Sequence, residues 1–252
     1  MNLSDNDLLR YSRHILLPAI DIGGQAAIGQ ARVLVVGLGG LGSPVALYLA
    51  AAGIGELLLA DDDRVDTSNL QRQIIHGEAS IGQAKVASAA AQIQALNPAV
   101  RTRQLACRLA DATLMDAVTD ADLVVDCSDN FGTRQALNRA CWERQKPLVS
   151  GAAIRWEGQI TSFDARQSTS PCYACLYPDL PEEGLTCSES GVISPLVGII
   201  GSYQALEALK IITGAGHNLV GRLQLFDGLT ASWREFKLPK DQHCTVCQAP
   251  RV

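Results

Sequence analysis

The sequence has few aromatic residues and no excess of positive charge. Aromatic side chains make up 5% of its 252 residues, and 21 lysines and arginines stand against 26 aspartates and glutamates, for a formal net charge of −5 at pH 7. No basic stretch is interleaved with aromatic residues, so the composition argues against a nucleic-acid-binding surface. The 47% of apolar residues exclude a disordered chain and are enough for a large buried core.

The sequence also lacks signs of export, of membrane insertion and of division into domains. Asp5 and Asp7 stand where a signal peptide needs positive charge, and no apolar stretch follows them. Residues 33–55 carry no charge, but Pro44 and several glycines interrupt them, so a strand, a turn and a helix explain this run better than a membrane span. We therefore expect one domain over residues 1–252 in the cytoplasm, with its eight cysteines reduced unless they bind metal.

A glycine-rich turn after a short apolar strand organises the first half of the chain. Residues 33–36 contain no polar side chain, which predicts a strand buried on both faces in a parallel sheet. Gly37, Gly39 and Gly42 have the G-x-G-x-x-G spacing that lets the backbone approach a phosphate. A helix over residues 43–52 would present its N–H groups and positive dipole end to that anion. A tight turn without a ligand is the alternative reading of this motif alone.

A second apolar strand, over residues 57–60, adds to the argument for a nucleotide. It ends at Asp61, which stands 19 residues after Gly42, where a ribose-binding carboxylate is expected. The unit therefore predicts nucleotide binding. Strand–helix–strand geometry does not distinguish between nucleotides, so an NAD-dependent oxidoreductase stays an alternative at this point.

The remaining pattern predicts an α/β fold, with a Rossmann-like, mostly parallel sheet, helices on both faces, and antiparallel strands toward the C-terminus. Residues 101–105 suit a strand, and apolar runs predict strands over residues 121–127 and 147–151, the last ending in a turn at Gly151. Helical spacing predicts helices over residues 82–96, 112–118 and 133–145, and a long helix or pair over 193–213. Alternating patterns predict antiparallel strands over residues 160–163, 223–226 and 233–236.

Polar residues follow two of these strands, at the edge where open α/β sheets bind ligands. Residues 64–73 form a polar loop after the second strand, and Ser128, Asp129 and Asn130 follow the strand over residues 121–127. Lys85 stands in the first turns of the helix over residues 82–96, where its charge opposes the helix dipole. That local cost favours a partner anion for Lys85, and a solvated lysine is the alternative.

The N-terminal residues predict a helical arm. Residues 4–17 have amphipathic spacing, with Ser4 as the N-cap, and the glycine-containing residues 21–30 separate them from the first strand. An arm so far ahead of the sheet is able to lie across a neighbouring molecule. On the sequence alone, Arg13 within it is a solvated helix charge.

Two C-x-x-C pairs, Cys172 with Cys175 and Cys244 with Cys247, predict a structural zinc site. Each pair presents two thiolates, and four sulfurs complete a tetrahedral Zn²⁺ site with no open position. A thioredoxin-like redox pair is the alternative for one unit, but the presence of two units argues against it. We expect Zn²⁺ to staple the C-terminal tail to the body of the protein.

The other cysteines fall into two groups. Cys107, Cys127 and Cys141 lie in apolar runs and are expected in the core. Cys187 lies in a polar, glycine-containing stretch, residues 182–191, which we interpret as a crossover segment.

Together these features resemble the MoeB/ThiF family of adenylyltransferases, which activate ubiquitin-like sulfur-carrier proteins and are related to the ubiquitin-activating enzymes. The resemblance covers nearly the whole chain and is carried by the glycine motif, both cysteine pairs, residues 126–130 and 150–153, Lys85, and the run Ser68, Asn69, Leu70, Gln71, Arg72 and Gln73. A dehydrogenase is not expected to carry Asn69, Arg72, Lys85 and Asp129 together with four paired cysteines.

The resemblance implies ATP-dependent adenylylation of the carrier's C-terminal Gly-Gly carboxylate, giving an acyl-adenylate and pyrophosphate. By family position, Gly37, Gly39, Gly40 and Gly42 form the nucleotide turn, Asp61 binds the ribose, and Asp129, next to Asn130, binds Mg²⁺. Asn69, Arg72 and Lys85 hold phosphates, with Ser68, Leu70 and Gln71 beside them. Arg13 reaches in from the other protomer of a homodimer, so the implied catalytic residues are Arg13, Arg72, Lys85 and Asp129.

The resemblance also implies three parts and a choice of carrier. The parts are an arm (residues 1–30), a nucleotide-binding core (31–165) and a crossover, carrier-binding and zinc-ligand region (166–252). Residues 150–160 look like the molybdopterin branch, whereas 60–63 and 225–228 look like the thiamine-pathway branch; we favour the molybdopterin carrier. We expect sulfur from a separate sulfurtransferase or cysteine desulfurase, because no such domain follows Cys247. A non-enzymatic, zinc-stapled nucleotide-binding scaffold is the remaining alternative.

Within this family picture, Cys187 is not expected to take part in acyl-adenylate formation. A nucleophilic thiol needs a lowered pKa, but Glu182, Glu183 and Glu189 stand near Cys187 in the sequence and would raise it. At most, a later sulfur-transfer step would need this thiol.

Overall fold

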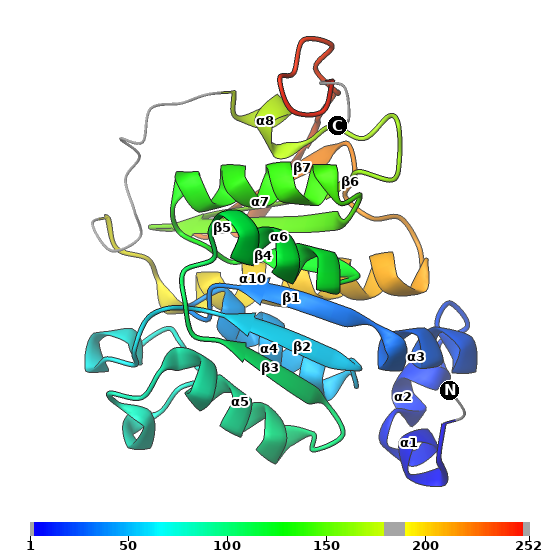
Figure 1. Cartoon of the computed structure of the whole chain (residues 1–252), viewed down its shortest axis with the longest axis vertical. Coiled ribbons are helices and arrows are strands. Elements are labelled where there is room, and N and C mark those ends of the chain that lie inside the picture. The colour runs from blue at the N-terminus through cyan, green and yellow to red at the C-terminus, as the bar shows by residue number, and fades with distance from the viewer. Residues whose placement is uncertain (1–2, 179–189, 249–252) are drawn as a thin grey trace.

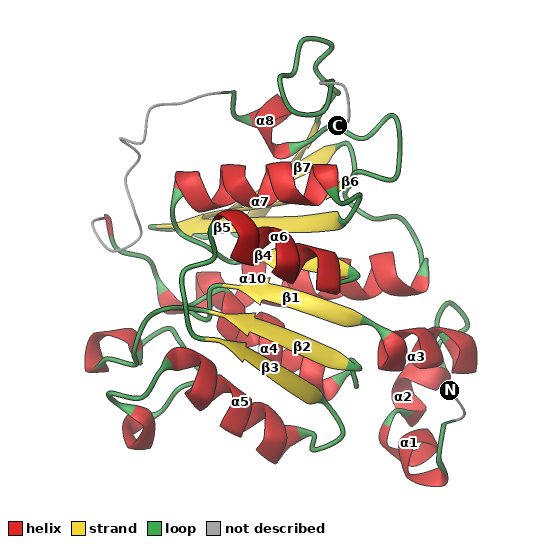
Figure 2. Ribbon diagram, viewed as in Figure 1, coloured by secondary structure: helices red, strands yellow, loops and turns green. Residues whose placement is uncertain are grey.

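The protein folds around one eight-stranded sheet with helices on both faces (Figures 1 and 2). The structure, a computed structural model, describes residues 3–178 and 190–248. The strand order is β3-β2-β1-β4-β5-β6-β7-β8. This confirms the predicted α/β class, with a parallel part followed by antiparallel strands.

Five parallel strands form the first part of the sheet, and their register places matching apolar residues side by side. They are β1 (Arg32–Val36), β2 (Glu56–Ala60), β3 (Arg101–Leu105), β4 (Leu123–Asp126) and β5 (Pro147–Ile154). Val35 of β1 pairs with Leu59 of β2 on one side and with Val125 of β4 on the other. The chain builds outward from β1 through β2 and β3, then crosses to β4 on the opposite side. The strand order therefore reverses between β1 and β4.

Three antiparallel strands extend the sheet: β6 (Glu157–Asp164), β7 (Arg222–Asp227) and β8 (Ser232–Lys237). The predicted turn at Gly151 is wrong, because β5 continues through it and pairs Gly151 with Ile160 of β6. Gly151 instead allows close helix packing: a Cβ there would lie 2.5 Å from the side chain of Gln204. The chain reverses four residues beyond Gly151, directly after the end of β5, where Arg155 adopts a left-handed φ of 53°.

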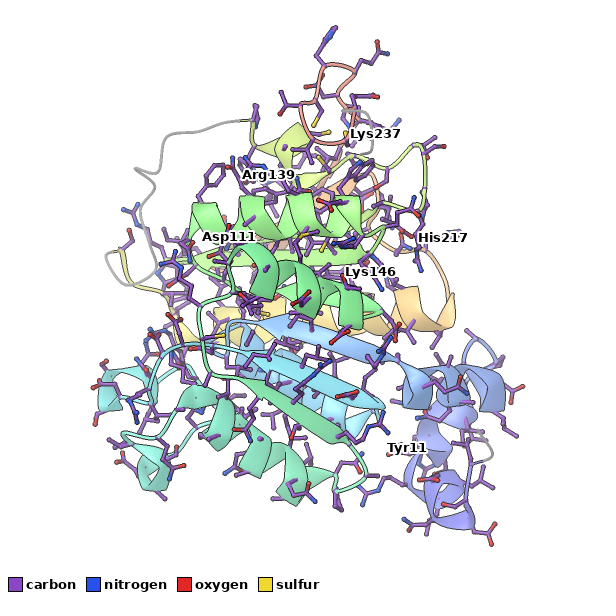
Figure 3. The ribbon with its side chains drawn as sticks, viewed as in Figure 1. Tyr11, Asp111, Arg139, Lys146, His217 and Lys237 are labelled. Atoms are coloured by element: carbon purple, nitrogen blue, oxygen red, sulfur yellow. The ribbon has the colours of Figure 1, made fainter. Side chains whose placement is uncertain are left out.

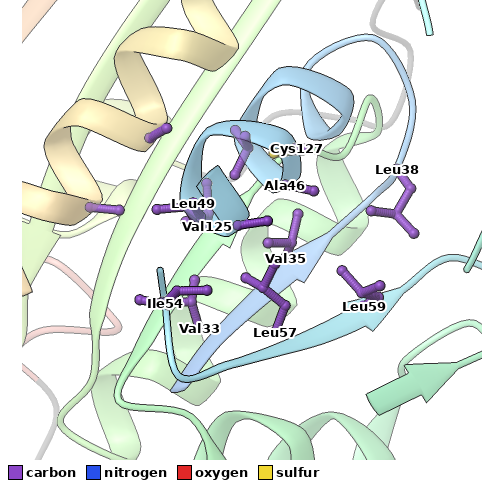
Figure 4. Close-up of a cluster of buried hydrophobic side chains, with 14 of the residues drawn as sticks. Val33, Val35, Leu38, Ala46, Leu49, Ile54, Leu57, Leu59, Val125 and Cys127 are labelled. Carbon is purple, nitrogen blue, oxygen red and sulfur yellow. The ribbon is translucent and has the colours of Figure 1, made fainter. Parts of the chain in front are cut away.

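Two apolar cores cover the two faces of the sheet. Helices α4 (Gly42–Ala51), α5 (Lys85–Leu96) and α10 (Ser194–Thr213) pack on one face. Helices α6 (Asp111–Asp120) and α7 (Phe131–Glu143) pack on the other. Figure 4 shows alternate residues of β1, Val33 and Val35, packed against Leu49 of α4. Alternation sends Leu34 to the opposite core, so β1 has no polar face, as its sequence predicts.

Helix α10 is a single helix, and it is long and apolar enough by length and composition to cross a membrane. It lies against α4, β5 and β6, and its residues Leu196, Val197 and Ile200 belong to a core cluster. This packing is that of the central helix of a folded domain. The uncharged run 33–55 is divided among β1, the glycine turn and α4.

The N-terminal arm consists of three short helices: α1 (Asp5–Arg10), α2 (Ser12–Ile15) and α3 (Asp21–Gln30). Ser4 caps α1 as predicted, but the expected helix over residues 4–17 is interrupted at Tyr11. Tyr11 is buried, packs on Gly53 and shares a 2.9 Å hydrogen bond with Asn97 Nδ2. Figure 3 shows Tyr11 on the arm, at the end of the sheet where β1 begins. The arm is thus anchored on the edge opposite to the glycine turn.

Candidate active site

A cleft of about 800 Å³ opens at the carboxyl ends of β1 and β4, where the strand order reverses. In open α/β sheets, the loops that leave such a point diverge to opposite faces and leave a crevice for a ligand. One loop here is the glycine turn after β1, and the other contains Ser128, Asp129 and Asn130 after β4. The topology therefore places the two predicted motifs on opposite sides of one cleft.

The glycines of the turn serve different geometric purposes. Gly37 has a φ of 90°, and a Cβ there would come within 2.8 Å of the Cys127 carbonyl oxygen. At Gly42 a Cβ would collide with the Gly37 carbonyl, because the start of α4 packs under the turn. Gly39 is different, since the nearest atom to a Cβ there is the Gln73 side-chain nitrogen at 3.5 Å. The first and last glycines build the turn, and Gly39 leaves its backbone open to the cleft.

Asp61 ties the end of β2 to the glycine turn. Its Oδ2 accepts a 2.7 Å hydrogen bond from the Leu38 N–H, and its Oδ1 accepts a 2.9 Å bond from the Asp63 N–H. Asp61 is partly exposed and lines the cleft. Each carboxylate oxygen keeps a free lone pair, so Asp61 is able to accept from a ligand hydroxyl as well as holding the turn.

Lys85 is a buried cation at the wall of the cleft. It is the first residue of α5 and 5% exposed, and its Nζ lies 2.8 Å from Oδ2 of Asp63, which is mostly exposed. The partner anion that the sequence favoured for Lys85 is therefore present within the chain. Because Asp63 stands in solvent, a ligand phosphate is able to compete for the same ammonium group.

Of the polar loop after β2, Arg72 and Gln73 line the cleft. Arg72 also donates a 3.1 Å hydrogen bond to the Ser68 carbonyl. Ser68 and Asn69 form a short 3-10 turn, η1 (Thr67–Asn69), in which their side chains bond within the loop. The cleft is not lined by the other four residues of this loop that were predicted to bind the nucleotide, which are Ser68, Asn69, Leu70 and Gln71.

The opposite wall combines an exposed carboxylate with a buried ionic network. Asp129 is exposed on the cleft, and Asn130 beside it caps α7 by accepting from the Thr133 N–H at 2.9 Å. Beneath them, Asp126 accepts from the Ser128 hydroxyl at 2.6 Å, and Arg134 donates to the Ser128 carbonyl at 2.6 Å. This network fixes the segment that carries Asp129.

Arg134 is a functional candidate that the sequence patterns did not single out. It is buried yet lines the cleft. Burial alone would lower its pKa, but Asp126 and Tyr173 raise the pKa above its ordinary value, so the guanidinium stays charged. The spacing of residues in the sequence does not distinguish Arg134 from the other arginine of α7, because tertiary packing decides which of the two is buried.

An aromatic wall closes the far end of the cleft. Tyr173 and Tyr177 pack as a tilted pair with ring centroids 5.2 Å apart, and the Tyr177 hydroxyl donates to Gln159 Oε1 of β6. Burial raises the pKa of Tyr173 to about 12, so this hydroxyl is protonated at neutral pH. Tyr173 opens the short helix α8 (Tyr173–Leu176), and its position between two predicted metal ligands gave no hint of this role.

Four cysteine sulfurs gather beside α8. The Sγ atoms of Cys172, Cys175, Cys244 and Cys247 lie within 4.8 Å of one another, with close pairs at 3.5 and 3.6 Å. A tetrahedral zinc site with Zn–S bonds of 2.3 Å needs sulfurs about 3.8 Å apart, so this donor set fits Zn²⁺. Asn138 Nδ2 and the Asp241 N–H point at two of these sulfurs, as donors around metal thiolates do.

The remaining predictions have mixed outcomes. Cys127 and Cys141 are buried, but the expectation of a core position for Cys107 is wrong: it is exposed and lines the cleft, because it follows the end of β3. Arg13 is exposed on the arm and does not line its own chain's cleft. Cys187 and residues 182–189 of its crossover segment lie outside the described residues.

The fold and cleft define a nucleotide-binding α/β protein of the Rossmann type, with Lys85 and Arg72 on one wall and Asp129 on the other. The ThiF family model matches residues 11–246, and the chain belongs to the ThiF family. The family replaces the NAD-dependent oxidoreductase as the interpretation of the glycine motif.

Curated relatives are similar over nearly the whole chain. The molybdopterin-synthase adenylyltransferase of Escherichia coli is 47% identical over 97% of this chain and 98% of its own length. The sulfur carrier protein ThiS adenylyltransferase of the same organism is 43% identical over 97% of both chains. The adenylyltransferase and sulfurtransferase MOCS3 of Sus scrofa is 47% identical, and the match covers 54% of that protein. Among solved structures, E. coli MccB with MccA-N7isoASN has a TM-score of 0.85 at 21% identity, covers 98% of this chain and 76% of that one, and supports the fold alone.

Proposed function

We propose that this protein adenylylates the C-terminal glycine of a ubiquitin-like sulfur-carrier protein with ATP. One observation carries the proposal: a single cleft joins the glycine turn, Asp61, Lys85 and Arg72 on one wall with Asp129 on the other, in a chain that is 47% identical to an adenylyltransferase over nearly its full length. In this reaction the carrier's carboxylate attacks the α-phosphate of ATP and displaces pyrophosphate.

The charges of the cleft suit this chemistry. The attacking carboxylate is already ionised at neutral pH, so no general base is required. The difficulty is that two anions must meet while negative charge develops on the leaving pyrophosphate. We assign phosphate binding to Arg72 and Lys85 and ribose binding to Asp61, all three of which line the cleft. Arg134 adds a buried positive charge near the aromatic end.

Two metal ions are part of the proposal. Asp129 is an exposed carboxylate across the cleft from the cations, and carboxylate oxygens are preferred ligands of Mg²⁺, which would neutralise the nucleotide phosphates. The four clustered cysteines would hold Zn²⁺ in a closed structural site. This site joins the tail after β8 to α8, and α8 carries the aromatic wall.

The third part of the proposal is a homodimer in which Arg13 serves the partner's cleft. The arm lies at the amino end of β1, whereas the cleft opens at the carboxyl ends of the strands (Figure 1). Leu9, Leu16 and Ile22 of this arm are more than half exposed, which suits a surface covered by another molecule.

We propose the molybdopterin-synthase carrier as the substrate, with the thiamine-pathway carrier as the second candidate. The relatives named for the two carriers are 47% and 43% identical to this chain, so identity favours the first only slightly. ATP and such carriers are cytoplasmic substrates, and we place the protein there.

The test is ATP–pyrophosphate exchange with each purified carrier. We expect exchange with the molybdopterin-synthase carrier and much less with the thiamine-pathway carrier. The matched control is the same carrier without its last two glycines, which should support no exchange. Exchange that favours the thiamine-pathway carrier would reverse the assignment, and absence of exchange with both would leave a nucleotide-binding scaffold.

A further inference from the structure

Gln73 has a buried carboxamide that is not satisfied within the protein. The side chain is 4% exposed, and its Oε1 is buried without a hydrogen-bond partner among the described residues. Burying an amide without a partner destabilises a protein, so such a group calls for an explanation. Gln73 lies directly after Arg72 and lines the cleft.

The carboxamide lies beside the one glycine of the turn that is left open. A Cβ at Gly39 would meet only the Gln73 side chain, at 3.5 Å from Nε2 and 3.9 Å from Cδ. In this type of turn the middle glycine is where the backbone approaches the phosphates of a bound nucleotide. Gln73 therefore borders the space that phosphate groups would occupy.

A purely structural role for Gln73 is poorly supported, because another residue of the same loop already holds the turn. His76 Nε2 donates to the Leu38 carbonyl at 3.0 Å, and its Nδ1 accepts from the Ser88 hydroxyl at 2.9 Å. Figure 4 shows Leu38 on the turn that follows β1. The loop is thus fastened to the turn by His76, while the carboxamide of Gln73 makes no such bond.

We propose that Gln73 is a ligand of the nucleotide phosphates, with its amide N–H groups donating to a phosphate oxygen held at Gly39. This inference rests on the proposed function and adds a residue to the ATP site. A carboxamide supplies two donors without adding charge, next to the charged donors of Arg72 and Lys85. Its Nε2 is the Gln73 atom nearest Gly39, so the donor is the part of the carboxamide that faces this space.

Gln73→Met keeps the length of the side chain but removes its polar atoms, so it separates a phosphate ligand from a structural residue. Loss of a phosphate ligand lowers the affinity for ATP, whereas loss of a structural hydrogen bond lowers the melting temperature. If Gln73 is a phosphate ligand, the free variant melts at the wild-type temperature or above, because an unpartnered polar atom is gone. Its affinity for Mg²⁺-ATP falls about tenfold to a hundredfold, the usual effect of losing a hydrogen bond to a charged group.

The experiment is isothermal titration with Mg²⁺-ATP, without carrier, together with thermal melting of the free proteins. Gln204→Met is the matched control, because Gln204 is an equally buried glutamine that has a partner, donating to the Asp126 carbonyl at 2.7 Å, and does not line the cleft. This control should melt at a lower temperature, which shows that the assay separates satisfied from unsatisfied carboxamides.

Wild-type affinity for Mg²⁺-ATP in Gln73→Met overturns the inference. Should that variant not fold, Gln73→Glu decides: it keeps the size, removes both donors and adds negative charge, so its affinity must fall further than tenfold for the inference to stand. If the wild-type protein itself does not bind Mg²⁺-ATP, the proposed function fails. If it binds ATP and both variants bind equally well, only the role of Gln73 fails.

Discussion

The central strands of the parallel half and the two outer strands of the antiparallel half differ in how deeply they are buried. Every residue of β4 is buried, as are four of the five residues in β1 and β2. In contrast, β7 is half-buried throughout and all six residues of β8 are exposed. The first half is stabilised mainly by apolar packing between two helical layers. Strands β7 and β8 depend more on their hydrogen-bonded ladder and on the cysteine cluster that follows β8.

The residues proposed for catalysis and the residues proposed to stabilise the fold lie in different parts of the sheet. The groups proposed to bind ATP stand at the carboxyl edge of the well-packed half, where an exposed side chain can be lost without affecting the core. The cysteine cluster belongs to the thinly packed half, where a lost link removes part of the support. Substitutions in the two halves should therefore change different measurements.

The largest expected effect is the loss of activity in Asp129→Ala. The carboxylate is exposed, so we expect the melting temperature to stay within about 2 °C of the wild type. Carrier-dependent pyrophosphate exchange should fall at least a hundredfold, because the proposed Mg²⁺ ligand is gone. Asp116→Ala, an exposed change on α6 outside the cleft, is the control. Exchange at near the wild-type rate would remove Asp129 from the mechanism.

The second prediction combines a residue of the N-terminal arm, Arg13, with a residue at the carboxyl ends of the parallel strands, Asp129. Arg13→Ala and Asp129→Ala are each expected to be inactive, but a mixture that exchanges subunits should recover one working site per heterodimer. That site combines Asp129 of one protomer with Arg13 of its partner. Each variant incubated alone is the control. No recovery of exchange activity, with mixed dimers demonstrated by mass spectrometry, would mean that Arg13 does not act across the interface.

The third prediction concerns the antiparallel half. We expect about one zinc per chain, and Cys172→Ser should lose it and melt roughly 10 °C lower, a shift equal to a few kcal/mol in a chain of this size. Hydrogen exchange should rise first in β7, β8 and the tail. Cys107→Ser, outside the cluster, should keep both zinc and melting temperature. Unchanged zinc content in Cys172→Ser would contradict the assignment.

The smallest expected effect is a pH dependence of folding stability that arises from His76, which holds the glycine turn. Burial lowers the pKa of His76 below its usual 6.5, nearby Lys85 lowers it further, and the bond to Leu38 and the charge of Asp61 oppose the shift. The folded protein therefore binds fewer protons at His76 than the unfolded chain. Stability is lost as the pH falls from about 6.5 toward the lower folded pKa.

Urea unfolding across this pH range measures that loss. His76→Gln, which keeps a donor for the Leu38 carbonyl but does not titrate there, should show a shallower fall. An identical pH profile in the two proteins would show that another group causes the acid sensitivity.

Much of the parallel half could be predicted from the sequence because its signals are local. Apolar runs without alternation identify strands buried on both faces, as at residues 33–36, and the glycine spacing identifies the turn. The same reasoning predicts that Asp61 and Asp129 stand at a ligand-binding edge, because parallel strands share their carboxyl ends. The two C-x-x-C pairs also predict a cluster of four sulfurs from their spacing in the sequence alone.

What only the tertiary structure decided depends on neighbours that are distant in sequence. Cys107, which was expected in the core, is exposed because β3 is an edge strand and its loop opens onto the cleft. The burial of Arg134, the pairing of Lys85 with Asp63 and the unpartnered carboxamide of Gln73 arise where separate segments converge on one cleft. Local pattern determines which strands and turns form. Long-range packing determines which polar side chains are buried away from water. It thereby also determines which charged groups they pair with and what chemistry they can perform.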